Sequence, residues 1–398
     1  MKLSDVAKSI PVSPLRGLAP LAHEAEKKGT KVYHLNIGNP DIETPAVMIN
    51  SLKKWTDKTI GYSDSHGDKH FLKSLLWYYR TLGFDKLHYS NLQVTFGGSE
   101  ALLWVFTTIC NPGDEIITFE PFYTNYSSFV VISHAKIVPI KTVIDSGFHL
   151  PESAQIEEKI TPKTRAILLC NPSNPTGTVY TKEELDMIVN IAKKNHLYII
   201  SDEVYREFVY DKKKSISMLE YADQYRDGII IVDSLSKRYS LCGARLGVIV
   251  SFNHELMSIF LRFAQARLSA GYIDQSVATE LVNVEDDYFA KVIEEYRLRR
   301  NLVVSELNKI EGVFCPNPEG AFYVIVRLPI EDSEQFAQWL LTDFSDNSET
   351  IMLAPATGFY SSKNLGHNEV RIAYVINRKD LGRSIELLKK ALIIYKSL

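Results

Sequence analysis

Two segments of the chain, SDEVYREFVY (201–210) and IIIVDSLSKRYSLCGARLG (229–247), decide the fold. Residues 229–232 form a continuous apolar run, which predicts a strand buried on both faces at the centre of a sheet. The strand leads directly to Lys237, the one lysine of the second segment. Around this lysine lie groups suited to binding an anion, namely the side chains of Ser234, Ser236 and Arg245.

A lysine in such surroundings suggests covalent chemistry on a phosphorylated aldehyde. The amine can form a Schiff base with the aldehyde, while the hydroxyls and the guanidinium hold the phosphate dianion. Pyridoxal 5'-phosphate (PLP) is a compound of this kind. The alternative, from this spacing alone, is a lysine at the end of a strand in a solvated loop.

The composition excludes several classes of protein. With 398 residues, 45% of them apolar, the chain can form more than one domain. A net charge of -3 without a long basic run argues against nucleic-acid binding. No apolar run reaches membrane-spanning length, and the charged first 30 residues do not resemble a signal peptide, so a cytoplasmic protein is expected. No metal site is predicted, and the sequence contains no Cys-x-x-Cys pair. The four cysteines are expected to be buried thiols of a protein in a reducing compartment; they are Cys110, Cys170, Cys242 and Cys315.

Strands alternate with helices between residues 92 and 250. The predicted strands are 92–96, 115–119, 136–140, 165–170, 197–201, 229–234 and 246–250. A turn over 97–100 precedes a helix over 101–110, another helix is expected near 123–132, and Thr181 with Glu184 forms a capping box that begins a third. This alternation predicts an α/β fold, with a mostly parallel sheet flanked by helices on both faces.

The two ends of the chain have a different pattern. Helices over 13–29, 45–58 and 68–83 are expected before the alternating region, with a strand from residue 31. After residue 253 helices dominate as far as 311, and strands follow near 321–328, 351–353 and 370–374, with helices over 333–343 and 378–396. We therefore expect a smaller α+β domain formed by both termini, with 1–45 and 291–398 contributing to it and 46–290 forming the large domain.

Three turns near predicted strand ends carry further candidate groups. Gly97, Gly98 and Ser99 precede a helix, where free backbone N–H groups can bind an anion; a plain tight turn is the alternative. The loop NPSNPTG (171–177) can direct the amide of Asn174 into a crevice at the strand ends, or it can simply lead into a helix. Asp202 can pair with a protonated pyridine nitrogen, or it can cap a helix.

Taken together in their order, these motifs resemble the fold-type I aminotransferases of the aspartate aminotransferase superfamily, class I/II. The resemblance covers nearly the whole chain. It rests on LNIGNPD (35–41), GGSEAL (97–102), NPSNPTG (171–177), SDEVY (201–205), SLSKRYSLCGARLG (234–247), PEGAFY (318–323) and VRIAY (370–374).

The resemblance implies PLP as the cofactor and a role for each matching position. Lys237 would be the Schiff-base lysine and proton shuttle, and Asp202 would bind the pyridine nitrogen. Asn174 and Tyr205 would hydrogen-bond the ring oxygen O3'. Tyr123 would stack on the ring, although a core aromatic residue is the alternative there. The phosphate would be surrounded by Gly98, Ser99, Ser234, Ser236 and Arg245.

The resemblance also implies substrate and partner contacts. Arg371 would hold the substrate α-carboxylate with its planar guanidinium, helped by Gly38 and Asn174, whereas an exposed strand arginine is the alternative. Tyr62 would reach the phosphate of a partner subunit, so a homodimer with shared active sites is expected.

The expected reaction moves the amino group of an L-amino acid to a 2-oxo acid, with 2-oxoglutarate as the commonest acceptor in the family, by ping-pong chemistry. Donors of the aspartate, alanine or aromatic type stay open, because 266–276 lacks an arginine at the position expected for a distal carboxylate. Arg267 falls before that position, and Arg16 and Lys363 are better explained as surface charges. The Arg16 segment and 353–362 are expected to line the side-chain pocket.

Two other classes of function are compatible with parts of the sequence. A β-lyase or an aminocyclopropane-carboxylate synthase-like enzyme would share the scaffold and the proton-removal step, and would differ only in the fate of the carbanion. A non-catalytic PLP-sensing regulator would need a winged-helix domain, for which NIGNPD at residue 36 leaves no room.

Overall fold

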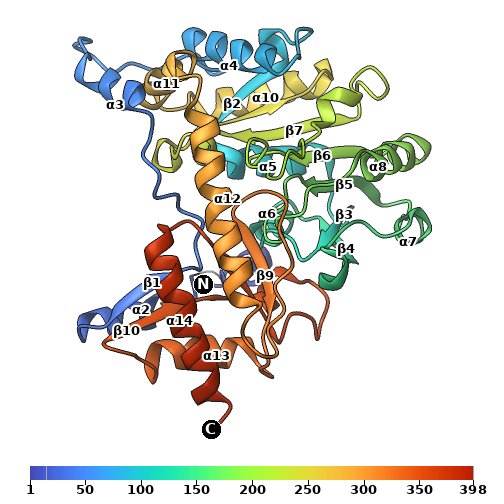
Figure 1. The fold of residues 1–398 in the computed structure, drawn as a ribbon. Helices are drawn as coiled ribbons and strands as arrows, with labels where there is room; N and C mark the ends of the chain where they lie inside the picture. The colour runs from blue at the N-terminus through green and yellow to red at the C-terminus, as the bar shows by residue number, and fades with distance from the viewer. Residues whose placement is uncertain (15, 398) are drawn as a thin grey trace.

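The computed structural model describes residues 1–14 and 16–397. Its central element is a seven-stranded sheet with the strand order β2-β8-β7-β6-β5-β3-β4 (Figure 1). The strands are β2 (Leu92–Thr95), β3 (Glu115–Glu120), β4 (Lys136–Lys141), β5 (Thr164–Cys170), β6 (Tyr198–Asp202), β7 (Ile229–Ser234) and β8 (Gly247–Val250).

The sheet is mostly parallel, as predicted. β4, β3, β5, β6 and β7 run in one direction, whereas β8 is antiparallel to both of its neighbours. Because β2 is in turn antiparallel to β8, it runs in the same direction as β7. The carboxyl ends of β2, β3, β5, β6 and β7 therefore meet at one edge of the sheet, which is where ligands bind in open α/β folds.

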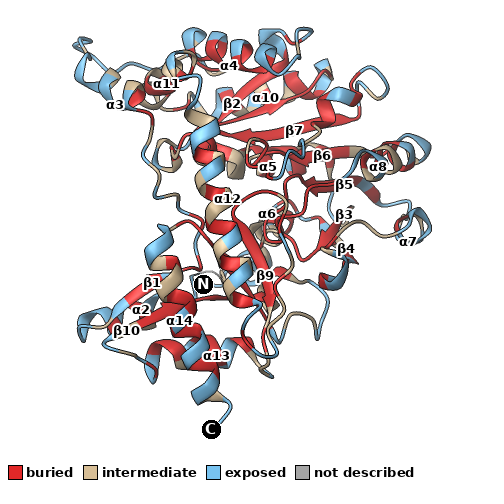
Figure 2. Cartoon of the chain, viewed as in Figure 1, coloured by how far each residue is buried: buried red, intermediate tan, exposed pale blue. Residues whose placement is uncertain are grey.

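Helices cover both faces of this sheet. Alternate residues of each strand point to opposite faces, so Ile199 and Ile231 join one apolar core while Ile200 and Val232 join another. The first core is closed by α3 (Ala46–Lys53), α4 (Lys69–Thr81), α8 (Lys182–Asn195) and α11 (Tyr272–Thr279). The second is closed by α5 (Gly97–Ile109), α6 (Asn125–Ile132) and α10 (His254–Arg267). Figure 2 shows the central strands buried beneath these layers.

A separate core joins residues from both ends of the chain. β1 (Lys31–His34) pairs in parallel with β10 (Glu349–Met352), and β11 (Ala354–Pro355), β12 (Glu369–Ala373) and β9 (Tyr323–Arg327) form an antiparallel sheet. These strands pack with α12 (Tyr288–Leu307), α13 (Ser333–Thr342) and α14 (Arg378–Tyr395), and α2 (Ala19–Lys27) adds a small apolar cluster. In Figure 1, α12 runs from beside the large sheet to this lower part. The domain boundary proposed at 290 falls in the first turn of α12.

Several predicted helix limits were wrong. The segment 97–100 is not a turn before the helix, because α5 begins at Gly97 itself. The helix predicted over 45–58 ends at Lys53, and the one predicted over 13–29 begins only at Ala19. The capping box of Thr181 and Glu184 at the start of α8 is confirmed. The short helices α1 (Asp5–Ser9) and α7 (Ser153–Glu157) were not predicted. Among the described residues, no helix is long and apolar enough to cross a membrane.

Two cysteine predictions also need correction. Cys170 and Cys315 are buried as expected, whereas Cys110 and Cys242 are partly exposed. Cys242 lines the main cavity of the protein, described next.

Candidate active site

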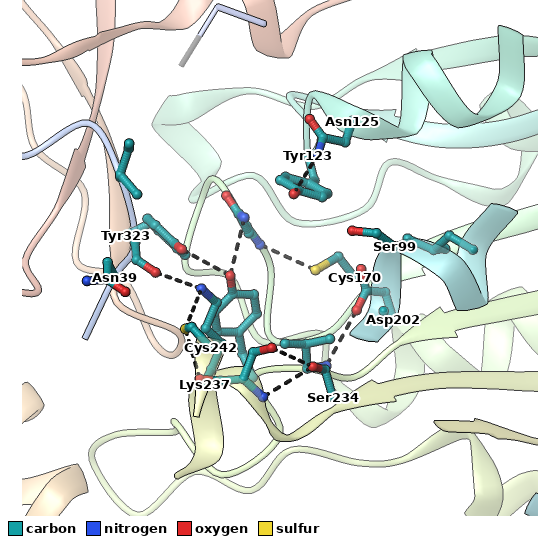
Figure 3. Close-up of a pocket in the computed structure, with 18 of the residues that line it drawn as sticks. Asn39, Ser99, Tyr123, Asn125, Cys170, Asp202, Ser234, Lys237, Cys242 and Tyr323 are labelled. Carbon is teal, nitrogen blue, oxygen red and sulfur yellow. Dashed lines mark hydrogen bonds between the residues drawn. The ribbon is translucent and has the colours of Figure 1, made fainter. Parts of the chain in front are cut away.

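A cavity of about 590 Å³ opens at the carboxyl edge of the large sheet, between that sheet and the antiparallel sheet of the second core (Figure 3). A volume of this size suits a small ligand or cofactor. The predicted site residues that line the cavity are Gly38, Gly98, Ser99, Tyr123, Asn174, Asp202, Tyr205, Ser234, Ser236, Lys237, Arg245 and Arg371.

Lys237 enters this cavity from the one-turn helix α9 (Leu235–Arg238), which follows β7 directly. The side chain of Ser234 caps that turn by accepting a hydrogen bond from the backbone N–H of Ser236. The Lys237 amine donates a hydrogen bond to the carbonyl oxygen of Gly38, 2.6 Å away, and lies 3.6 Å from Sγ of Cys242. Among the described residues that line the cavity, Lys237 is the one lysine, and it is presented on a short helix with its amine directed inward.

Asp202 is the last residue of β6, and its side chain is buried. Burial raises the pKa of this carboxyl to about 6, against the lowering effect of a hydrogen bond from the Tyr126 hydroxyl, 2.6 Å from Oδ2. The alternative role of Asp202 as a helix cap does not apply, because no helix follows it directly. The carboxylate also accepts a long hydrogen bond of 3.5 Å from the backbone N–H of Val204, and a buried carboxylate with so few donors is well placed to pair with a cationic N–H group.

A row of polar side chains crosses the cavity next to Asp202. Nδ2 of Asn174 lies 3.4 Å from the hydroxyl of Tyr205, which in turn lies 3.0 Å from the hydroxyl of Tyr323. Burial, and then the neighbouring Tyr323, raise the pKa of Tyr205 well above its ordinary value, so Tyr205 stays protonated as a donor. These groups can hold an oxygen atom of a ligand ring.

The opposite end of the cavity is suited to an anion. α5 begins at Gly97, so its first N–H groups and its positive dipole end face the cavity beside Ser99. Gly97 has φ +76°, and a Cβ there would lie 2.8 Å from Nη2 of Arg245. Only glycine therefore allows the arginine to approach the helix end. Ser234 and Ser236 share a hydrogen bond of 2.9 Å at the same place.

Arg371 is a buried cation on β12, not an exposed strand arginine. Its guanidinium carbon lies over the rings of Tyr323 and Phe359, at 4.4 and 4.9 Å from their centres. Nη1 donates to Oδ1 of Asn174 at 3.0 Å, and Nη2 donates to the carbonyl of Asn36. Nε is buried without a hydrogen-bond partner among the described residues. Burial lowers the pKa of this guanidinium, an effect that a bound carboxylate would offset.

The segments 201–210 and 229–247 also carry a buried ion cluster, on the side that faces away from the cavity. Asp233 lies 2.9 Å from Arg238 through both of its carboxylate oxygens and 3.2 Å from Nη1 of Arg206. Arg206 also pairs with Glu203 at 2.8 Å, and Arg238 lies 2.9 Å from Glu207. Each residue of the cluster is adjacent in sequence to a residue that lines the cavity, or two positions from one. The cluster therefore fixes the backbone that presents Asp202, Tyr205 and Lys237.

Comparisons with known proteins agree with this geometry. The family model "Aminotransferase class I and II" matches residues 30–389. The chain therefore belongs to this family of aminotransferases. The aspartate aminotransferase of Pyrococcus horikoshii is 29% identical, over 93% of each chain. A (5-formylfuran-3-yl)methyl phosphate transaminase of Methanocaldococcus jannaschii is 31% identical over 94% of each chain. The solved alanine aminotransferase of Pyrococcus furiosus is 27% identical with a TM-score of 0.88, covering 99% of this chain and 100% of that one.

Class I and II aminotransferases are PLP-dependent as a family, and the residues of this aminotransferase fit the cofactor. The glycine cradle at Gly97 and the donors beside it suit the phosphate, and the buried carboxylate of Asp202 suits the pyridine nitrogen. The amine of Lys237 lies in the same cavity and could react with the aldehyde. Arg371, whose Nε has no hydrogen-bond partner among the described residues, could take a carboxylate.

Tyr62 is the one predicted site residue that this aminotransferase does not bring to the cavity. It lies between α3 and α4, and its side chain is 83% exposed. The expectation that it acts in a partner subunit remains a prediction.

Sequence reasoning missed two tyrosines of the site. Tyr126 lies in the first turn of α6, whereas Tyr123, three residues earlier, precedes the helix. Tyr323 was present in the motif PEGAFY but was not singled out. It is the first residue of β9, and the alternation along that strand predicts only its face, not the cavity beside it.

Other expectations about the side-chain pocket were partly correct. Arg16 and Ser13 line the cavity, as expected for their segment, so Arg16 is more than a surface charge. The tract 353–362 does not line the cavity; instead Phe359 supports Arg371 from behind. Arg267 forms an ion pair with Glu100 at 3.0 Å, and Lys363 is not among the lining residues.

Proposed function

We propose that this aminotransferase binds PLP through Lys237 and transfers the amino group of an L-amino acid to a 2-oxo acid in two half-reactions. The observation that carries the proposal is the position of the Lys237 amine in a cavity that also contains a buried carboxylate, Asp202, and a buried guanidinium, Arg371. When bound, PLP supplies an aldehyde that takes up the amino group and a ring that accepts an electron pair.

Asp202 and its neighbours would hold the cofactor ring. The Asp202 carboxylate would pair with the pyridine N–H, and this positive partner would bring its pKa below the value of about 6 that burial produces. Tyr205 and Asn174 would donate to the ring oxygen, and Tyr123 would cover a ring face. Ser99, Ser234, Ser236 and Arg245 would hold the phosphate together with the N–H groups of α5.

Arg371 would hold the substrate by its α-carboxylate. Its guanidinium is planar and lies over two aromatic rings, and such a planar group can bind a carboxylate through two parallel hydrogen bonds. The backbone of Gly38 lies at the same end of the cavity. The Cα–H bond of a substrate held there would be directed toward the amine of Lys237.

Lys237 would act as the general base and acid. Its amine would remove the proton from the substrate Cα and deliver it to the former aldehyde carbon of the cofactor, so one group would carry the proton between two positions. The hydrogen bond to the carbonyl of Gly38 supports this role, because it keeps the amine at the substrate end of the cavity.

The proposed acceptor is 2-oxoglutarate. Arg16 lines the cavity, and its side chain has no hydrogen bond or ion pair with the described residues. Burial raises the pKa of Tyr123, which lines the same cavity, to about 12, and the positive charges of Arg371 and then Arg16 oppose that rise. An unpaired cation facing the substrate end of the cavity favours a second carboxylate. For the donor, the names of the relatives differ from one another, and aspartate-, alanine- and aromatic-type amino acids remain candidates.

The proposed active unit is a homodimer with shared sites, located in the cytoplasm. The exposure of Tyr62 supports this assembly. In the single chain this tyrosine is 83% exposed, so its side chain is available for contact with a partner subunit. Sedimentation of the purified protein tests the assembly, and a monomer that retains activity would contradict it.

One experiment tests the central proposal. Purified protein is incubated with PLP, reduced with borohydride and digested, and the modified peptide is identified. The expected result is one pyridoxyl group, on Lys237. The Lys237→Ala variant should still bind PLP but turn over negligibly. Modification elsewhere, or steady-state transamination by that variant, would contradict the proposal.

Product analysis separates transamination from the alternatives on the same scaffold. The wild-type protein is mixed with single amino acids in the absence of an acceptor. Transamination releases the matching 2-oxo acid and leaves the amino group on the enzyme until an acceptor is added. A β-lyase would instead release pyruvate with a thiol, and an aminocyclopropane-carboxylate synthase-like enzyme would release a cyclic amino acid.

A further inference from the structure

Tyr323 contacts three of the predicted site residues through one side chain. Its hydroxyl oxygen lies 3.0 Å from the hydroxyl of Tyr205, and its ring centre lies 4.4 Å from the guanidinium carbon of Arg371. The same hydroxyl lies so close to the backbone of Gly38 that a Cβ there would come within 1.7 Å of it. The side chain is buried, and Figure 3 shows it at the same side of the cavity as Lys237.

We propose that Tyr323 is a positioning residue with two separable functions: its hydroxyl strengthens the hydrogen bond that Tyr205 gives to the cofactor, and its ring holds Arg371 for the substrate carboxylate. This inference rests on the proposed function. It assigns to one side chain of β9 a contact with the cofactor-binding residues of the large sheet and a contact with the substrate-binding arginine.

The hydroxyl function follows from counting protons. The Tyr205 hydroxyl has one proton to donate. Two side-chain groups lie within hydrogen-bond distance of it, the hydroxyl of Tyr323 and Nδ2 of Asn174. If Tyr205 donates to a ring oxygen, its own oxygen is left to accept, and Tyr323 is the hydroxyl donor within reach. The order of donation is then Tyr323 to Tyr205 to the ring oxygen. A donor that is itself hydrogen-bonded in this way is polarised and donates more strongly.

The ring function follows from the surroundings of Arg371. The guanidinium is buried, and its central carbon lies within cation–π distance of two rings, Tyr323 at 4.4 Å and Phe359 at 4.9 Å from the ring centres. Ring faces attract cations without using the N–H groups, so the edge of the guanidinium stays available for a carboxylate. Removing one ring would allow the guanidinium to tilt, while the hydrogen bond from Nη1 to Asn174 remained.

Two substitutions separate these functions. Tyr323→Phe removes only the hydroxyl and keeps the ring, whereas Tyr323→Leu removes both. Tyr374→Phe is the matched control, because Tyr374 is another buried tyrosine whose hydroxyl lies 3.4 Å from the carbonyl of Ala321, and it does not line the cavity. Thermal unfolding of each variant first checks that the fold is retained.

The first readout is the pH midpoint of the visible absorption band of protein-bound PLP. A hydrogen bond to the ring oxygen stabilises negative charge there and so favours the deprotonated form of the chromophore. A weaker bond therefore moves the midpoint to higher pH. Tyr323→Phe and Tyr323→Leu should both show this upward shift, and Tyr374→Phe should not.

The second readout is KM for the amino acid, compared with kcat. Tyr323→Phe should leave KM within about twofold, because the face over Arg371 is kept. Tyr323→Leu should raise KM roughly threefold to thirtyfold, which is the fold-change expected for loss of one cation–π contact.

The possible outcomes are distinguishable. An unchanged midpoint in Tyr323→Phe would overturn the hydroxyl function, and equal KM values for Tyr323→Phe and Tyr323→Leu would overturn the ring function, while both leave the proposed function intact. If the wild-type protein forms no visible band with PLP and shows no transamination, the proposed function fails and this inference fails with it.

Discussion

The hydroxyl of Tyr126 lies 2.6 Å from Oδ2 of Asp202, and it is the strongest hydrogen bond that this carboxylate receives. Burial raises the pKa of Asp202 to about 6, although the bond from Tyr126 opposes the rise. In the cofactor-free protein the ionised carboxylate is therefore held at an energetic cost. The position of the Asp202 carboxylate therefore serves the binding of a cationic partner and not the stability of the fold.

Asp202→Asn should stabilise the cofactor-free protein above pH 6. Because the folded-state pKa lies above the unfolded value of 3.8, the contribution of Asp202 to stability is full below pH 4 and is lost as pH rises through 6. A shift of about two units corresponds to roughly 3 kcal/mol. Urea unfolding of both proteins from pH 4 to pH 8 measures the difference. Parallel pH profiles would contradict the raised pKa, and the variant should also lose most of its transaminase activity.

Breaking the ion cluster beneath Lys237 should be strongly destabilising. Arg238 contacts both oxygens of the buried Asp233. Burial alone would raise the pKa of Asp233, but the charges of Arg238 and Arg206 hold it below its ordinary value. Arg238→Met leaves that carboxylate short of one cation, so we expect a loss of about 3–5 kcal/mol in the free energy of unfolding.

The double variant Asp233→Asn/Arg238→Met tests the cause of that loss. Removing both charges should cost less than removing Arg238 alone, because position 233 then carries no carboxylate, while Glu207 loses its contact with Arg238 in both variants. Chemical denaturation gives both values. Simple additivity of the two single substitutions would show that packing of the arginine, not its charge, explains the effect.

The strands along the chain and most of the residues that line the cavity were predictable from local patterns. Apolar runs such as Ile229–Val232 are buried in any parallel sheet, and turns at strand ends bring Asn174 and Lys237 to one edge. Tyr323 and Tyr126 were not predictable as site residues. Their role depends on which side chains a second core brings against the first, and a tyrosine on a strand or helix has the same sequence pattern whether it packs or lines a cavity.

Arg371→Lys should raise KM for every amino acid and 2-oxo acid substrate alike. Lysine keeps the charge but loses the planar pair of donors and the stacking between Tyr323 and Phe359. Loss of a charge-assisted hydrogen bond suggests an increase of roughly tenfold to a hundredfold. Steady-state kinetics with several donors measures it. An effect confined to one substrate would mean that Arg371 contacts a side chain instead of the shared carboxylate.

Arg16→Gln should weaken the binding of 2-oxoglutarate and leave that of pyruvate unchanged. Both acceptors offer the same carboxylate to Arg371, and only 2-oxoglutarate has a second one for the unpaired guanidinium of Arg16. We expect about a tenfold rise in KM for 2-oxoglutarate and no change for pyruvate. Arg80→Gln, on the exposed face of α4, is the matched control.

Salt separates a direct contact of Arg16 from a change in cavity shape. Arg16 is exposed to solvent, so added salt should screen its attraction for the second carboxylate. In the wild-type protein the ratio of KM for 2-oxoglutarate to KM for pyruvate should therefore rise with ionic strength. In Arg16→Gln that ratio should stay constant, because the screened charge is gone. A ratio that rises equally in both proteins would assign the second carboxylate to a different cation of the cavity.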